Sequence, residues 1–128
     1  MTIASAELLR SGVTLKRQEV PLPEFGDGVS VYVRQLTAKE WSEFRMSMLN
    51  SKFEKDAGKL GELKERYIIF CMVDESGQPI FSLDDLETVK QWPAIVVNRL
   101  NDAADALNEG DLNSKSLGND SETTGGDS

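Results

Sequence analysis

One continuous apolar segment constrains this chain more than any other feature. Every residue in 67–73 is apolar, and Leu60 and Leu63 extend the same stripe toward the N-terminus at helical spacing. The stripe predicts a helix that must be covered on several sides and therefore lies at the centre of the core. One alternative stays open, in which residues 67–73 form a buried strand that turns at 74–77 and returns through 79–81.

A helix-start signal places another helix ahead of this segment. Residues 37–40, Thr-Ala-Lys-Glu, form a capping box, in which the threonine hydroxyl and the glutamate carboxylate each accept a hydrogen bond from a backbone N–H at the helix start. Trp41, Phe44 and Met48 then share one face, which we expect to be buried. Residues 50–61 carry two glycines among alternating charges and predict a break between the two helices.

Two further helices are expected after residue 81. Ser82 suits an N-cap, and the acidic residues that follow it are favoured by the helix dipole. Pro93 ends this helix near Trp92 and opens the next one, because proline lacks the N–H that a helix interior needs but fits a first turn. The last helix extends to Gly110, and its apolar stripe consists of Val96, Leu100, Ala103 and Leu107.

The N-terminal part of the chain predicts a β-hairpin after a short helix. Residues 4–10 are good helix formers that stop before Gly12. Residues 13–21 favour a strand that ends at prolines. Gly-Asp-Gly at 26–28 then supplies a turn, and the alternation of valine with polar or aromatic residues over 29–34 predicts the second strand.

These elements together define a mainly α fold in one domain. We expect a small helical domain of three to four helices with a short N-terminal β-hairpin over residues 1–109. Residues 110–128 contain almost no apolar side chain, so burial cannot offset the entropy lost on ordering them. They predict a disordered acidic tail.

Composition excludes several classes of function. The chain has no histidine and one cysteine, which rules out the common zinc sites and the Ser/His/Asp and Cys/His catalytic arrangements. A net charge of −8 repels phosphates, so nucleic acids and membrane surfaces are poor partners. No apolar run approaches the roughly 20 residues that cross a bilayer, and no export signal precedes residue 12. We therefore expect a cytoplasmic protein that is no enzyme, needs no cofactor and binds other proteins.

A cluster of carboxylates is the strongest candidate for chemistry. Its members are Asp74, Glu75, Asp84, Asp85 and Glu87. A calcium loop starting at Asp74 fails, because its sixth and twelfth positions hold Pro79 and Asp85 instead of glycine and glutamate. We interpret the cluster as a turn followed by a helix start. A hard-metal or acid–base site is the alternative.

Four single residues have two readings each. Cys71 lies inside the apolar run, which favours a buried thiol over a reactive one. Trp41, Trp92 and Phe81 suit either the core or an interface, and the core is favoured. The number of large apolar residues in so short a chain also favours self-association.

Three stretches follow an order seen in one protein family. They are LPEFGDGVSVYVRQLTAKEW at residues 22–41, RYIIFCMVDESGQPIFSLDDLETVKQWP at 66–93, and IVVNRLNDAADALNE at 95–109. This order resembles that of the tail assembly chaperones of long-tailed bacteriophages, over roughly residues 20–109.

The resemblance implies a function and a set of partners. It implies a small helical protein of the host cell cytoplasm that binds the tape measure protein, keeps it soluble and assists polymerisation of the tail tube. It further implies a homo-oligomer that is absent from the mature virion, and a longer frameshifted form that contacts the tail tube protein. The alternative is a small acidic adaptor or inhibitor that binds a basic protein partner.

The last helix and its entry supply the predicted partner-binding residues. Val96 and Val97 lie about 100° apart on a helix, so we expect that both cannot face one narrow core. On this argument the binding surface comprises Trp92, Val96, Val97 and Leu100. A partner with helical apolar anchors would suit such a surface.

Overall fold

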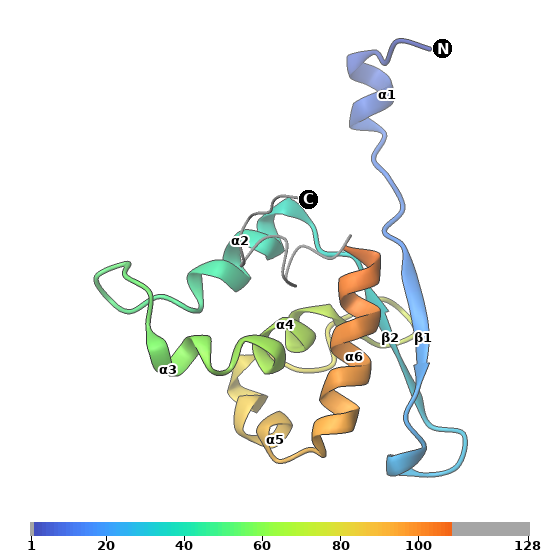
Figure 1. The fold of residues 1–128 in the computed structure, drawn as a ribbon. Helices are drawn as coiled ribbons and strands as arrows, with labels where there is room; N and C mark the ends of the chain where they lie inside the picture. The colour runs from blue at the N-terminus through green and yellow to red at the C-terminus, as the bar shows by residue number, and fades with distance from the viewer. Residues whose placement is uncertain (1, 109–128) are drawn as a thin grey trace, which may run out of the picture.

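The computed structural model of the protein describes residues 2–108, and six α-helices and three strands make up this part (Figure 1). In chain order they are α1 (Ala6–Arg10), β1 (Arg17–Pro21), β2 (Ser30–Arg34), α2 (Ala38–Met46), α3 (Ala57–Leu60), α4 (Leu63–Cys71), β3 (Met72–Val73), α5 (Leu86–Lys90) and α6 (Ala94–Leu107). Two 3₁₀ turns, η1 (Pro23–Phe25) and η2 (Leu83–Asp85), lie in the connections.

The N-terminal β-hairpin is confirmed and belongs to a three-stranded antiparallel sheet in the order β1-β2-β3. β1 begins at Arg17, so the predicted start at residue 13 is wrong: Val13 is 88% exposed and lies in a segment that leads away from the body (Figure 1). Gly28 has φ of +76° in the turn, a backbone conformation that glycine adopts without strain.

The apolar run 67–73 combines both readings that the sequence left open. It is helical through Cys71, and then Met72 turns to an extended ψ of 127° and pairs with Val33 of β2. The predicted turn follows, where the side chain of Asp74 accepts hydrogen bonds from the backbone N–H groups of Ser76 and Gln78. The sequence could not divide the run between the two readings, because a buried strand of two residues leaves no period of its own.

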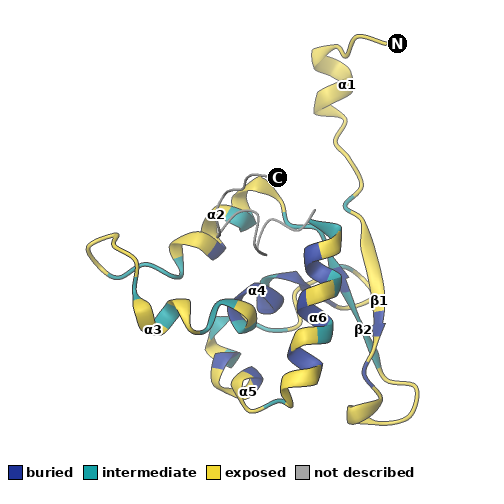
Figure 2. Ribbon diagram, in the orientation of Figure 1, coloured by how far each residue is buried: buried dark blue, intermediate teal, exposed yellow. Residues whose placement is uncertain are grey.

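The core lies where α4 meets α6, α2 and the sheet (Figure 2). Tyr67, Ile68 and Cys71 of α4 are fully buried, as are Phe44 of α2 and Leu100 of α6. The Tyr67 hydroxyl donates a hydrogen bond of 3.3 Å to the backbone carbonyl of Ala104 in α6. The prediction that the apolar run forms the centre of the core is confirmed.

Capping interactions begin the helices as predicted. In α2, Thr37 Oγ1 accepts from Glu40 N at 3.1 Å, and Glu40 Oε1 accepts from Thr37 N at 2.9 Å. A similar arrangement begins η2, where Ser82 Oγ accepts from Asp84 N at 3.2 Å and Asp85 Oδ2 accepts from Ser82 N at 2.9 Å. Pro93 is the N-cap of α6, within one residue of its predicted position.

The helix count exceeds the predicted three to four. α1 and α3 are single turns, and α3 forms inside the expected break because Asp56 accepts a hydrogen bond from Lys59 N and caps it. The disordered tail predicted for 110–128, and the predicted domain boundary at 109, lie outside the described residues.

We predict that Thr37→Ala lowers the free energy of unfolding by about 1 kcal/mol, because it leaves the Glu40 backbone N–H without its cap. For a domain of this size the loss corresponds to a Tm lower by roughly 4–8 °C. Thermal unfolding followed by circular dichroism measures it. Thr14→Ala, in the exposed segment before β1, is the control, and an equal fall in both variants would contradict the capping role.

Candidate protein-binding surfaces

An aromatic cluster lies at the junction of η1, α5 and α6. Trp92 is at its centre, with the ring of Phe25 at 5.2 Å in an edge-to-face arrangement and that of Phe81 at 5.8 Å. Phe25 is 48% exposed, and Ile95, in the first turn of α6, is 64% exposed. We call these three aromatic residues, together with Ile95, which follows Trp92 by three residues in the chain, the Trp92 patch.

An ion pair holds one side of the Trp92 patch. The two terminal nitrogens of Arg99 on α6, Nη1 and Nη2, donate hydrogen bonds to the carboxylate of Glu24 at 2.8 and 2.7 Å. Nη1 also donates to the Pro21 carbonyl. The hydrogen bonds from Arg99 lower the pKa of Glu24 to about 2. Because Glu24 precedes Phe25, this pair fixes the turn that presents the Phe25 ring.

The four residues predicted to bind a partner are only partly accessible. Val96 and Leu100 are fully buried and Val97 is 6% exposed, whereas Trp92 is half-buried. The premise that Val96 and Val97 cannot share one core is wrong, because α6 packs against α4 on one side and against the hairpin on another. Contact of these residues with a partner stays a prediction.

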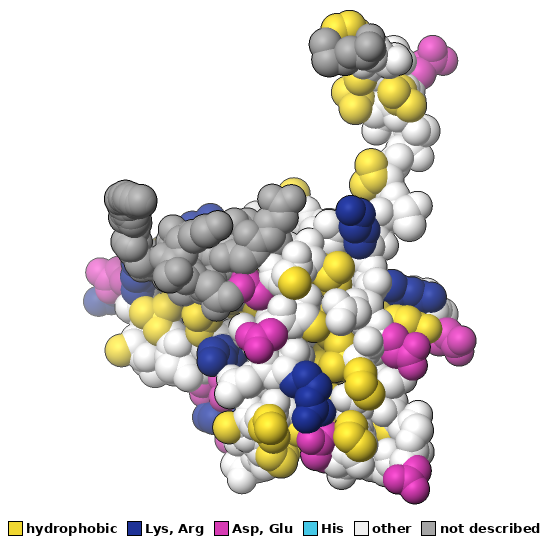
Figure 3. All heavy atoms as spheres, turned by 45° about the vertical axis from the view of Figure 1, so that its right-hand side comes forward, with side chains coloured by type: hydrophobic (Ala, Val, Ile, Leu, Met, Phe, Trp, Pro, Cys, Tyr) yellow, Lys and Arg dark blue, Asp and Glu magenta, His cyan; other side chains and the backbone are white. Residues whose placement is uncertain are grey.

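Sequence reasoning missed Phe25 and Ile95. Phe25 stands alone in a turn between prolines and glycines, and an aromatic residue in a turn is the only signal that could have singled it out. Ile95 adjoins the buried valines of α6 and cannot be told from them by type. Figure 3 shows apolar side chains gathered between charged ones at the lower part of the face that includes the hairpin.

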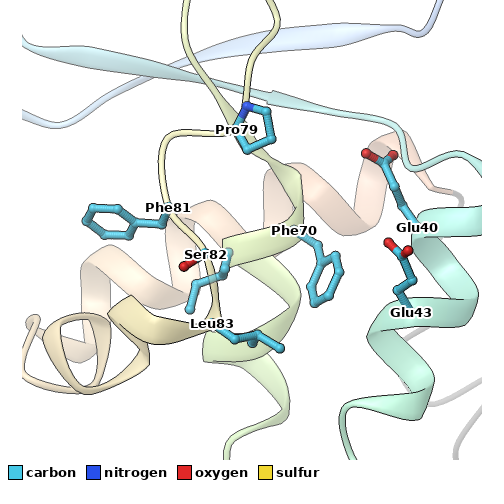
Figure 4. A pocket seen from close by; sticks show the side chains of 8 residues that line it. Glu40, Glu43, Phe70, Pro79, Phe81, Ser82 and Leu83 are labelled. Atoms are coloured by element: carbon cyan, nitrogen blue, oxygen red, sulfur yellow. The ribbon is translucent and has the colours of Figure 1, made fainter.

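A second surface is an apolar groove of about 330 Å³ between α2 and the segment that leads into η2 (Figure 4). Apolar side chains line most of it, and Glu40 and Glu43 of α2 lie across from Phe70 of α4. The lining residues are Glu40, Glu43, Ile69, Phe70, Pro79, Phe81, Ser82 and Leu83.

The two groove carboxylates differ in their environment. Glu40 makes two hydrogen bonds with the guanidinium of Arg34, at 2.9 and 2.7 Å, and these bonds lower its pKa to about 2. Glu43 is exposed on the same helix one turn later. The negative charge at the α2 rim of the groove is therefore that of Glu43, because Arg34 balances the charge of Glu40.

The residues considered for chemistry have structural roles. Asp74 organises a turn and Asp85 caps a helix, as the interpretation of the acidic cluster predicted. Within residues 2–108 no group of three or more acidic or cysteine side chains is placed to hold a metal ion. Cys71 is buried, and burial raises the pKa of its thiol. No helix in the described part of the chain is long and apolar enough to cross a membrane.

Comparison with known proteins identifies one fold. No protein-family model matches the chain, and no curated protein does. Among solved structures, the tail assembly chaperone of bacteriophage HK97 is similar, with a TM-score of 0.52 and 22% sequence identity over 73% of this chain and 87% of that chain. The protein thus has the fold of a phage tail assembly chaperone.

The free energy of unfolding should fall in acid, because protonation of Glu40 breaks its ion pair with Arg34. The folded state holds the pKa of Glu40 at about 2, below its ordinary value of 4.5, so the pair stabilises the fold above pH 4.5 and the stabilisation is lost as pH falls toward 2. We predict that Glu40→Gln is less stable than wild type at pH 7 and that the difference narrows across this window. Urea unfolding at pH 7, 4 and 2.5 measures it, and parallel pH profiles would contradict the assignment.

Proposed function

We propose that this protein is a member of the phage tail assembly chaperone family. The observation that supports this proposal most is the likeness of its fold to the HK97 tail assembly chaperone over 87% of that chain. The resemblance of residues 20–109 to the same family comes from the sequence and points the same way. Neither argument depends on the Trp92 patch or the groove.

In this function the protein binds the tape measure protein in the host cell cytoplasm, keeps it soluble and assists polymerisation of the tail tube, and it does not remain in the mature virion. Its net charge of −8 supports a solubilising role, because like charges keep the complexes apart. Contact with the tail tube protein through a longer frameshifted form, and self-association of the chain, are parts of the same proposal.

We place the client-binding surface at the Trp92 patch. A long helical client offers apolar anchors at i, i+3, i+4 and i+7, and the exposed Phe25 and Ile95 with the half-buried Phe81 and Trp92 offer apolar surface to such anchors. Of the residues nominated from the sequence, Trp92 belongs to this patch. Val96, Val97 and Leu100 would then support it from beneath, because they anchor α6 in the core.

Co-expression with the tape measure protein of the same phage tests the function. We expect a stable complex that sizes as one species, while the tape measure protein expressed alone is insoluble. A soluble tape measure protein that does not bind this chain would contradict the proposal, and would leave an acidic adaptor as the better reading.

The binding surface is tested by Ile95→Asp combined with Phe25→Ser. Aspartate in the first turn of α6 agrees with the helix dipole, so the fold should be retained. We expect loss of at least about 90% of the captured tape measure protein, since each truncated anchor at an interface costs about tenfold or more in affinity. Val13→Asp, an exposed aliphatic residue far along the N-terminal segment, is the matched control. If the double variant and the Val13→Asp control captured equal amounts of tape measure protein, the client would bind at another surface.

A further inference from the structure

The connection between α2 and α3 forms a closed loop with its own hydrogen bonds. Asn50 N donates to the Glu54 carbonyl at 2.8 Å, and Phe53 N donates to the Asn50 carbonyl at 2.9 Å. The side-chain oxygen of Asn50 accepts from the backbone N–H groups of Lys52 and Glu54. The loop is therefore a defined structure, and we call residues 50–55 the Phe53 loop.

Phe53 is presented at the tip of this loop. Its side chain is 70% exposed, and its φ of +62° makes it the one non-glycine residue with positive φ in residues 2–108. Glycine or asparagine adopts this conformation more easily than an aromatic residue. Folding of the monomer thus gains little from phenylalanine at this position, which indicates a contact outside the monomer.

The Phe53 loop and the groove are complementary in charge, and the apolar lining of the groove suits the exposed aromatic ring of the loop. Lys52, Glu54 and Lys55 are the charged residues of the loop and all three are exposed, so the loop carries one excess positive charge beside Phe53. The groove has apolar walls, and its rim on α2 carries the exposed carboxylate of Glu43, whereas Glu40 is paired with Arg34. A volume of about 330 Å³ suits one aromatic anchor better than a row of helical anchors.

We propose that the groove receives Phe53 of a second copy of this chain, with Lys52 and Lys55 beside Glu43. The loop projects from the body between α2 and α3 (Figure 1), and a second copy supplies the apolar groove with Glu43 at its rim that suits the ring and its lysines. Loop and groove are different surfaces, so the contact is either reciprocal in a dimer or repeated head to tail. The inference rests on the self-association in the proposed function. Of the residues that we assign to client binding, only Phe81 also lines the groove, and neither variant below changes it.

Phe53→Asn separates association from folding. Asparagine tolerates positive φ, so we expect a monomer with a Tm equal to or above that of wild type. Its association should weaken by about 30-fold, the effect of losing an interface anchor. Sedimentation equilibrium over a concentration series measures it, with Val13→Asp as the matched control that should associate like wild type. A monomeric wild-type protein, or association of Phe53→Asn equal to wild type, would overturn the proposal.

A mixing experiment tests the pairing of the two surfaces. Glu43→Arg with Pro79→Arg places two cations at the groove and leaves the Phe53 loop intact; both positions are exposed. We expect each variant alone to be monomeric and a mixture with Phe53→Asn to contain a one-to-one complex, because one intact loop then meets one intact groove. Absence of that complex would overturn the pairing. A groove variant that still associates but loses the tape measure protein would assign the groove to the client instead.

Discussion

The burial of α4 is the constraint on which the rest of this structure depends. A segment that is apolar on nearly every side cannot be covered by one neighbour, so α6, α2 and the sheet must all pack against it. Tyr67 illustrates the result: its ring is enclosed with those of Trp41 and Phe44, and its hydroxyl reaches the backbone of α6. The positions of α2 and α6 follow from this requirement, and with them the groove and the aromatic cluster at their ends.

Charge is arranged around this core in a few ion pairs that hold peripheral elements in place. Arg99 fixes the turn before β2 through Glu24, and Arg34 fixes the start of α2 through Glu40. Pairs that remain partly accessible to solvent add little stability each. Their contribution here is to orientation, since each holds a segment that presents an apolar side chain or a carboxylate at a candidate binding surface.

Local signals predicted several element starts but few surfaces. The capping boxes at Thr37 and Ser82 and the start of α6 at Pro93 were readable because caps and prolines act within one turn. The strand at Met72 was not, because it exists only through pairing with Val33. The burial of Val97 could not be predicted from the sequence either. Whether a helix is covered on one side or on two depends on elements that are distant in the chain.

The sequence alone therefore determined the helical class, the central apolar segment, the hairpin and the lack of histidine chemistry, since each follows from residue type and local spacing. Only the tertiary structure decided which apolar residues remain exposed to solvent. Ile95 and Val96 are adjacent β-branched residues in one helix, yet one is 64% exposed and the other is fully buried. The direction in which α6 faces α4 makes that difference, and it is set by packing between segments some thirty residues apart.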